Sequence, residues 1–232
     1  MTSTTRTPRT STPVTTPSWW RALAGVEVAL AAVAVVADLL LPALVLVVMA
    51  ALSLAVRRQR PGTLGFHRPA RPGRLALTVL GLTVAWTAVQ FLLVTPLVEA
   101  LTGSSHDVSD LAEVEGDAGL LLVLVVASWT IAALGEETAF RGYLLTRVTD
   151  ACGGPGRAAT VVAVLVSSLL FGLIHTEQGL AGVVITAVDG VFLAVLRLRL
   201  DGGVWASVLA HGFNNTLGLT VFFLVGPVAA PW

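Results

Sequence analysis

The chain contains no lysine, a single cysteine and few charged residues for its length. Only 12% of its 232 residues are charged, and all fourteen basic residues are arginine. A typical soluble domain has about 25% charged residues. Cys152 has no second cysteine to pair with, so an intramolecular disulfide framework is excluded. The shortage of charge argues against an ordinary soluble domain.

Apolar residues take the place of the missing charges, and they are grouped. Hydrophobic residues make up 55% of the chain, and the mean hydropathy is +0.85. They form runs of roughly 17–25 residues, the length that crosses a hydrocarbon core about 30 Å thick. We therefore predict an all-α fold, a polytopic membrane bundle of about seven transmembrane helices. The predicted spans are residues 20–37, 39–56, 75–101, 118–148, 158–175, 179–196 and 204–226.

The composition also suggests how the chain is divided. Residues 1–18 are rich in Thr, Ser and Pro and cannot bury a core, so we expect a disordered cytoplasmic tail there. Residues 19–117 are expected to hold the N-terminal transmembrane helices. Residues 118–227 are expected to form a C-terminal helix bundle, and the candidate catalytic residues discussed below all lie in it.

The arginines predict the orientation of the bundle, because cytoplasmic loops carry an excess of Arg and Lys. With seven spans, the arginine-bearing connections and the N-terminus fall on one side. The connection after the third span holds five acids and no arginine: Asp107, Asp110, Glu113, Glu115 and Asp117. We predict a multi-pass integral protein of the cell membrane with a cytoplasmic N-terminus. This topology accounts for the arginine-rich loop 57–74, so we expect the bilayer and not nucleic acid as its partner.

Several polar side chains fall inside the predicted spans. At the centre of a bilayer a charge costs from about 2.5 to more than 10 kcal/mol, so such residues are functional candidates by default. They are Glu136, Glu137, Arg141, His175, His211 and Asn215. Asp189, in the span next to the histidines, is a further residue of interest.

Residues 134–141, with the sequence LGEETAFR, carry three of these groups. Glu137 precedes Arg141 by four residues, which is the favourable order for a helical ion pair. Glu136 projects about 100° away from Glu137 on an α-helix and has no partner on its own helix. An unpaired carboxylate of this kind is a candidate general base. The alternative is that both acids lie in headgroup water at a helix end.

The other candidates lie in the fifth and seventh spans. His175 follows Phe171 by four residues, and His211 and Asn215 are four apart on one helix face. Each alone is compatible with a structural role, such as an interhelical hydrogen bond. Together, three helices each offer a group suited to activating water. A carboxylate and two imidazoles could bind a metal, or they could hold a water molecule between a base and oxyanion donors.

These residues resemble the motifs of the CPBP family of intramembrane proteases, the CAAX prenyl protease, bacteriocin-processing or ABI family. That family shows the motifs EExxxR, FxxxH and HxxxN or HxxxD. The matching residues here are Glu136, Glu137 and Arg141, then Phe171 and His175, then His211 and Asn215. The motifs occur in this order within residues 118–220. The resemblance implies an endopeptidase that hydrolyses peptide bonds of membrane-associated or prenylated, CAAX-like substrates.

The resemblance also implies a role for each motif residue. Glu136 would activate water, and His175, His211 and Asn215 would complete the catalytic site. The supporting residues would be Glu137, Arg141 and Phe171. Many members of the family are assumed to use zinc, which His175, His211 and Glu136 would hold here. A metal-free mechanism, with glutamate as the base, is equally open at this stage.

Two other functions remain open. A non-catalytic membrane scaffold or immunity protein would keep the same residues without turnover. An ion-coupled transporter also places Glu and His inside the membrane, although the paired broken helices of repeated halves are not apparent in this sequence.

The depths of the three candidate residues disagree. Measured along ideal helices from Arg147, Gly203 and Arg157 respectively, Glu136 lies about 16 Å deep, His211 about 12 Å and His175 about 27 Å. The fifth span is therefore expected to begin outside the hydrocarbon, to tilt or to break.

Overall fold

The computed structural model describes residues 18–226 of the chain. The predicted tail, apart from Ser18, lies outside the described residues. Within them the fold is all-helical, apart from a single antiparallel bridge between Phe66 and Gly203. The all-α prediction is therefore confirmed for this part of the chain.

The helices follow the predicted apolar segments closely. The first two are α1 (Ser18–Val36) and α2 (Pro42–Arg57). One long helical segment follows as α3 (Pro72–Val89), η2 (Gln90–Val94) and α4 (Thr95–Thr102), and another as α5 (Ala118–Ala127), η4 (Ser128–Leu144) and α6 (Leu145–Ala151). The last three are α7 (Arg157–Leu173), α8 (Gly179–Arg199) and α9 (Val204–Val225). Short 3₁₀ turns, η1 (Pro61–Leu64), η3 (Ser109–Val114) and η5 (Thr176–Gln178), lie in the connections.

Local sequence explains several of the helix ends. Prolines stand in the first turns of α2 and α3, where a missing N–H costs no helical hydrogen bond. The segment ending in α4 stops at Gly103, whose φ of 64° is left-handed, a conformation that glycine adopts without strain. Residues 128–144 are π-helical, with wider turns than an α-helix. Such turns often occur at functional sites.

Length and composition make five of the helical segments within residues 18–226 candidate membrane spans: Ser18–Val36, Pro72–Thr102, Ala118–Ala151, Thr176–Arg199 and Val204–Val225. The protein is therefore a multi-pass membrane protein. The apolar helices α2 and α7 have 16 and 17 residues. An α-helix of 17 residues is about 26 Å long, which is shorter than a hydrocarbon core of about 30 Å. For this reason the seven crossings predicted from the sequence are not confirmed.

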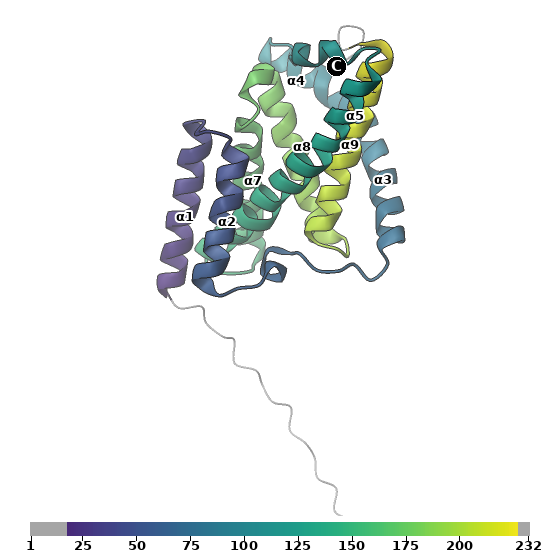
Figure 1. The fold of residues 1–232 in the computed structure, drawn as a ribbon. Helices are drawn as coiled ribbons and strands as arrows, with labels where there is room; N and C mark the ends of the chain where they lie inside the picture. The colour runs from purple at the N-terminus through teal and green to yellow at the C-terminus, as the bar shows by residue number, and fades with distance from the viewer. Residues whose placement is uncertain (1–17, 227–232) are drawn as a thin grey trace, which may run out of the picture.

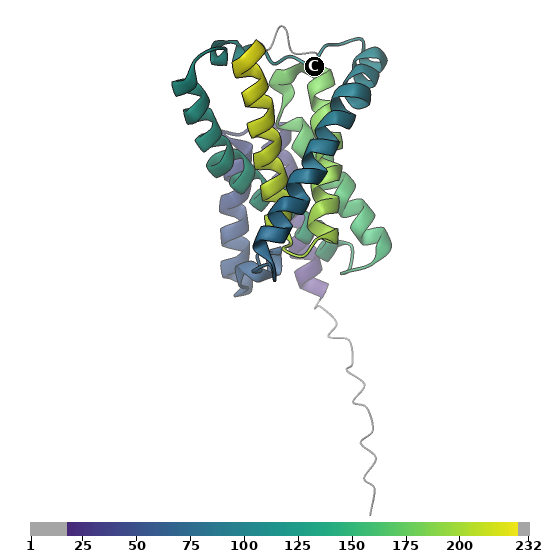
Figure 2. The same cartoon turned by 90° about the vertical axis from the view of Figure 1, so that its right-hand side faces the viewer.

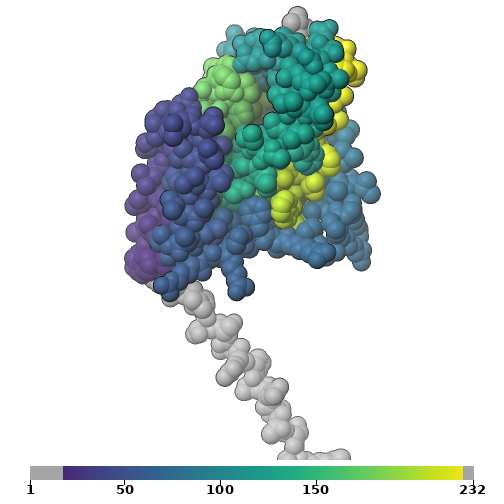
Figure 3. All heavy atoms as spheres, in the orientation of Figure 1, coloured from purple at the N-terminus to yellow at the C-terminus, as the bar shows by residue number. Residues whose placement is uncertain are grey.

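The long segment from α5 to α6 crosses the bundle obliquely, as Figure 1 shows. It begins at the end of the molecule that carries α4 and finishes near the base of α1 and α2. Helix α9 packs against η4, and α8 packs against α7. The space-filling view in Figure 3 shows α1 and α2 covering one side of the molecule. The oblique segment thereby connects the N-terminal helices with the site described below.

The two ends of the bundle differ in charge. Figures 1 and 2 show the arginine-rich connection from α2 to α3 at one end and the acidic connection from α4 to α5 at the opposite end. This separation agrees with the sequence-based topology. The assignment of the arginine-rich end to the cytoplasm stays a prediction.

A polar cluster fastens α1 and α2 to α6, and we call it the anchor cluster: Glu27, Ser53, Arg57 and Arg147. Glu27 forms an ion pair with Arg57 and also accepts from Ser53 Oγ at 3.0 Å. Arg147, with 1% of its side chain exposed, donates from Nε to Ser53 Oγ at 2.9 Å. Its remaining nitrogens reach Asp150 at 2.8 Å and Gln59 at 2.9 Å. Arg147, predicted to flank a loop, is thus buried between helices.

Helices α7 and α8 approach closely because two glycines lie at their contact. A Cβ on Gly172 would lie 2.4 Å from the carbonyl oxygen of Val183. A Cβ on Gly190 would lie 2.8 Å from Cα of Ser168. Both distances are shorter than real contacts allow, so larger residues would push the helices apart. This contact fixes the position of α8 against the helix that leads into His175.

Candidate active site

The buried ion pair predicted within η4 is present. Arg141 Nη1 lies 3.0 Å from Glu137 Oε1, and both side chains are fully buried. A buried charge without a partner is strongly destabilising, so each residue requires the other. The alternative considered from the sequence placed Glu136 and Glu137 in headgroup water at a helix end. The full burial of Glu137 does not agree with that alternative. Glu136 is 16% exposed.

Phe171 of α7 joins this pair to both histidines. The guanidinium of Arg141 lies over its ring, 4.0 Å from the centroid, in cation–π geometry. The rings of His175 and His211 pack against the same ring at steep angles, 67° and 83°, with centroid distances of 5.0 Å and 5.9 Å. One aromatic side chain therefore holds groups from η4, α9 and the end of α7 together.

Glu137 also sets the orientation of His211. The Nδ1–H of His211 donates to Glu137 Oε1 at 3.0 Å. A ring nitrogen fixed in this way determines the tautomer and aims the other nitrogen. Nε2 of His211 consequently faces Glu136, whose Oε2 lies 3.9 Å away. That gap is too long for a hydrogen bond and is a distance at which a bridging water is to be considered.

The Glu136 carboxylate, which faces His211, can accept a further hydrogen bond. Glu136 Oε2 is buried and has no hydrogen-bond partner among the described residues. Buried polar atoms are rarely left without a partner, and each exception calls for an explanation. A water molecule between Glu136 and His211 would satisfy it.

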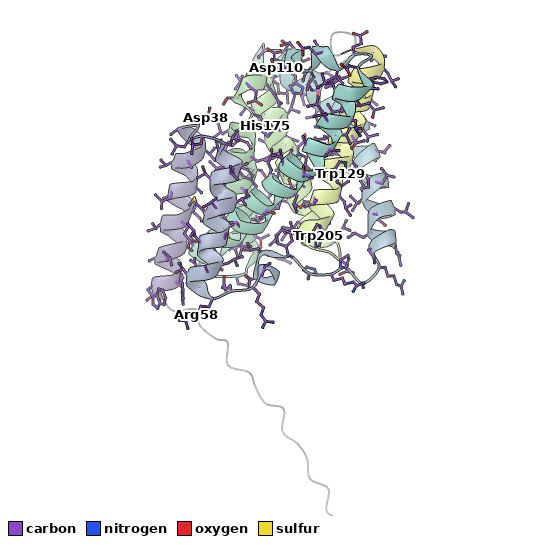
Figure 4. The ribbon with its side chains drawn as sticks, in the orientation of Figure 1. Asp38, Arg58, Asp110, Trp129, His175 and Trp205 are labelled. Atoms are coloured by element: carbon purple, nitrogen blue, oxygen red, sulfur yellow. The ribbon has the colours of Figure 1, made fainter. Side chains whose placement is uncertain are left out.

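His175 lies just beyond the end of α7. Its Nδ1–H donates to the Phe171 carbonyl at 2.9 Å, so Nε2 carries the lone pair when the ring is neutral. Figure 4 shows His175 toward the end of the bundle that carries Asp110, away from the end near Arg58. Helix α7 thus runs from Arg157 almost to His175, so His175 lies far from the arginine-rich end, as the sequence predicted.

One pocket of about 520 Å³ nevertheless brings the candidate residues together. Its lining includes Glu136, His175, His211 and Asn215. The oblique path of the α5–α6 segment (Figure 1) makes distance along that helix a poor measure of depth. The pocket also reaches His106, which lies in the acidic connection. The pocket thus extends from Glu136 and His175 to the acidic connection.

The close approach of α9 to η4 depends on Gly212. A Cβ there would lie 2.6 Å from the ring of Trp129. The same indole donates to Thr216 Oγ1 at 3.0 Å. Gly212 follows His211 directly, so this contact places the His211 ring against Glu137.

Further polar residues line the pocket, and two of them, Asn214 and His106, were not predicted from the sequence. Asn214 accepts a hydrogen bond from the Thr87 hydroxyl at 3.0 Å. His106 Nε2 lies 3.1 Å from Gln178 Oε1. Asp189, noted from the sequence as a residue of interest, accepts from the indole N–H of Trp86 at 2.7 Å. The position of Asn214 in an apolar span was a signal that could have drawn attention to it, whereas His106 lies in a loop and gave none.

The proposed zinc ligands Glu136, His175 and His211 line the same pocket but do not form a metal-binding cluster. No group of three or more His, Cys, Asp or Glu side chains that could hold a metal ion is found within residues 18–226. Nδ1 of each histidine is hydrogen-bonded to the protein, which leaves Nε2 as the nitrogen that can face the pocket. The arrangement of Glu136, His175 and His211 does not fit a zinc centre, so the mechanism below passes no step through a metal.

Comparison with known proteins gives one result. Residues 118–217 match the family model described as type II CAAX prenyl endopeptidase, Rce1-like. This segment contains all seven motif residues from Glu136 to Asn215. No match is found among curated proteins or among solved structures.

Proposed function

Because residues 118–217 form a type II CAAX prenyl endopeptidase Rce1-like domain, we propose that the chain is an intramembrane endopeptidase in which Glu136 activates a water molecule. The observation that carries this proposal is the unpartnered Glu136 Oε2, which faces His211 Nε2 across 3.9 Å within the pocket. A water molecule held there would contact both the base, Glu136, and the imidazole of His211.

In the first step, Glu136 accepts a proton from this water molecule, and the water oxygen attacks the scissile carbonyl carbon. The lone pair of His211 Nε2 accepts a hydrogen bond from the second O–H of the water and so orients the water. Glu137 keeps His211 in the required tautomer, and Arg141 holds Glu137 in place. General base catalysis of this kind contributes about 10²–10⁴-fold to a rate.

The attack places negative charge on the carbonyl oxygen, which needs donors. The amide NH₂ of Asn215 can donate whatever the protonation state of the site. His175 can donate from Nε2 once its ring is protonated, because Nδ1–H is held by Phe171. Glu136 then returns its proton to the amide nitrogen as the C–N bond breaks. The products are a new carboxylate terminus and a new amine terminus.

The surroundings of the pocket support a membrane-associated substrate. Most of its lining is apolar, with Leu124, Ile131 and Leu219 among the wall residues. The helices that supply these walls are candidate membrane spans. We propose that membrane-associated or prenylated CAAX-like peptides enter this pocket, in a chain with seven membrane helices and a cytoplasmic N-terminus.

Substitution of Glu136 by glutamine tests the proposal. Glutamine keeps the shape of the side chain and cannot take up the proton, so we expect kcat/KM to fall by about 10²–10⁴-fold. The purified proteins would be assayed on a prenylated CAAX peptide and on a library of membrane peptides, with and without a chelator. Glu113→Gln is the matched control, because Glu113 is exposed in the acidic connection.

Retention of activity in Glu136→Gln would overturn the assignment of the base. Loss of wild-type activity with the chelator would overturn the metal-free mechanism. Absence of cleavage by a well-folded wild-type protein would favour the non-catalytic scaffold.

A further inference from the structure

The pocket contains a second acid that the proposed mechanism does not use. Asp189 of α8 lines the same cavity as Glu136 and His211. It does not belong to the three motifs that carry the proposed chemistry. A carboxylate in a mostly apolar membrane pocket is costly, and such residues commonly mark a substrate or ion path.

Asp189 is held in place by two neutral side chains, Trp86 and Gln90. Its Oδ1 accepts from Trp86 Nε1 at 2.7 Å. Trp86 belongs to α3 and stacks on Phe192, with ring centroids 4.7 Å apart and an interplanar angle of 8°. The tight contact of Gly190 with Ser168 also fixes α8 at this level. Asp189 is therefore positioned firmly on the wall of the pocket.

Asp189 also lacks a cation, in contrast to other acids inside the bundle. Glu27 is paired with Arg57, and Glu137 with Arg141. Within residues 18–226, no arginine or histidine nitrogen lies within 4.0 Å of the Asp189 carboxylate. The Trp86 indole and the Gln90 amide are neutral, so neither supplies a positive charge. A positive group that entered the pocket would supply the missing partner.

We propose that Asp189 forms a subsite that binds a basic side chain of the substrate, lysine or arginine, near the peptide bond that the water activated by Glu136 attacks. This inference rests on the proposed function, because it takes the occupant of the pocket to be a peptide. Both carboxylates line one cavity of about 520 Å³, so a single extended peptide segment would reach them together. Apolar walls beside the Asp189 carboxylate favour a long side chain with a charged tip.

Two variants separate charge from structure. Asp189→Asn removes the charge but keeps an oxygen that can accept the Trp86 hydrogen bond. Trp86→Phe removes the hydrogen bond but keeps the charge. A structural role predicts that Trp86→Phe has the larger effect on selectivity, whereas a cation-binding subsite predicts that Asp189→Asn has it.

The experiment uses pairs of apolar peptides. The two members of a pair differ at one position, which is lysine in one and norleucine in the other, and this position is moved step by step along the residues around the cleaved bond. We expect wild-type kcat/KM to favour lysine by about tenfold or more at one position, in line with a charge pair that excludes water. Asp189→Asn should reduce this ratio to about one, and Trp86→Phe should retain it. No lysine preference at any position, or a preference that survives Asp189→Asn, overturns the subsite.

A binding measurement distinguishes failure of the subsite from failure of the proposed function. The same peptides are titrated into Glu136→Gln and into the double variant Glu136→Gln, Asp189→Asn. If no peptide is cleaved by the wild type, tighter binding of a lysine peptide that is lost in the double variant still supports the subsite. Equal or undetectable binding of both members of every pair overturns it.

Discussion

Two buried polar clusters occupy this bundle, and they differ in how completely their atoms are paired. In the anchor cluster, all three guanidinium nitrogens of Arg147 have protein partners, in Ser53, Asp150 and Gln59. Among the described residues, the anchor cluster has one buried side-chain atom without a hydrogen-bond partner, Arg57 Nη2, whereas the cluster around η4 has four: Glu136 Oε2, Glu137 Oε2, and Nε and Nη2 of Arg141.

The difference shows where capacity for chemistry lies. A polar network that satisfies its members stabilises and orders the helices that it joins. A network with an unsatisfied carboxylate on a pocket wall can bind water or substrate without first breaking an internal bond. We therefore assign stability to the anchor cluster and catalysis to the cluster around η4.

The largest expected effect comes from Glu137→Gln, which breaks the second cluster at its centre. The change leaves Arg141 without a counter-charge, and loss of one partner of a buried ion pair costs about 3–5 kcal/mol of stability. It also weakens the hydrogen bond that orients His211. We expect a lower free energy of unfolding together with lower activity per folded molecule, measured by denaturant titration in detergent and by peptide cleavage. A fully active and fully stable variant would contradict the role of Glu137.

Arg147→Met is expected to lower stability without impairing the site. Removing the guanidinium breaks the links to Ser53, Asp150 and Gln59 and leaves Glu27 with fewer partners. We expect a loss of about 2–3 kcal/mol in the free energy of unfolding, less than for Glu137→Gln, because Glu27 keeps Arg57 as a partner. Activity per folded molecule should stay within about twofold of the wild type, because a stability effect outside the site does not alter transition-state binding. Impaired catalysis in well-folded protein would show that the two clusters are coupled.

Gly212→Ala should give a smaller effect, confined to the contact between α9 and η4. The new Cβ would meet the Trp129 ring at 2.6 Å, and overpacking of this kind costs about 1–3 kcal/mol. Displacement of His211 should lower kcat more than it lowers stability. Gly81→Ala in α3 is the matched control, since its Cβ would meet nothing within 4 Å. Equal effects of the two substitutions would contradict the proposed tight contact.

Much of this arrangement could be predicted from the sequence, because long apolar runs and charged residues within them are local signals. The helices fall close to the predicted spans, and the Glu137–Arg141 pair follows from a spacing of four residues. Contacts between distant helices left no such signal. The bond between His211 and Glu137 joins residues 74 apart, and the Trp86–Asp189 bond joins residues 103 apart.

Two further features depend on three-dimensional packing. The π-helical turns of residues 128–144 have no counterpart in the apolar pattern of the sequence. Arg147 was expected to mark a loop, because a terminal arginine commonly faces headgroups. It is buried because the N-terminal helices supply Ser53 and Gln59 as partners. These partners come from a part of the chain that carries none of the motifs.

The most direct test compares Glu136→Gln with Arg147→Met in one set of measurements, the free energy of unfolding and kcat/KM per folded molecule. We predict that Glu136→Gln keeps its stability and loses about 10²–10⁴-fold in kcat/KM, while Arg147→Met loses stability and keeps its activity. The reverse pattern, with an active Glu136→Gln and a folded but inactive Arg147→Met, would contradict the assignment of catalysis to the cluster around η4.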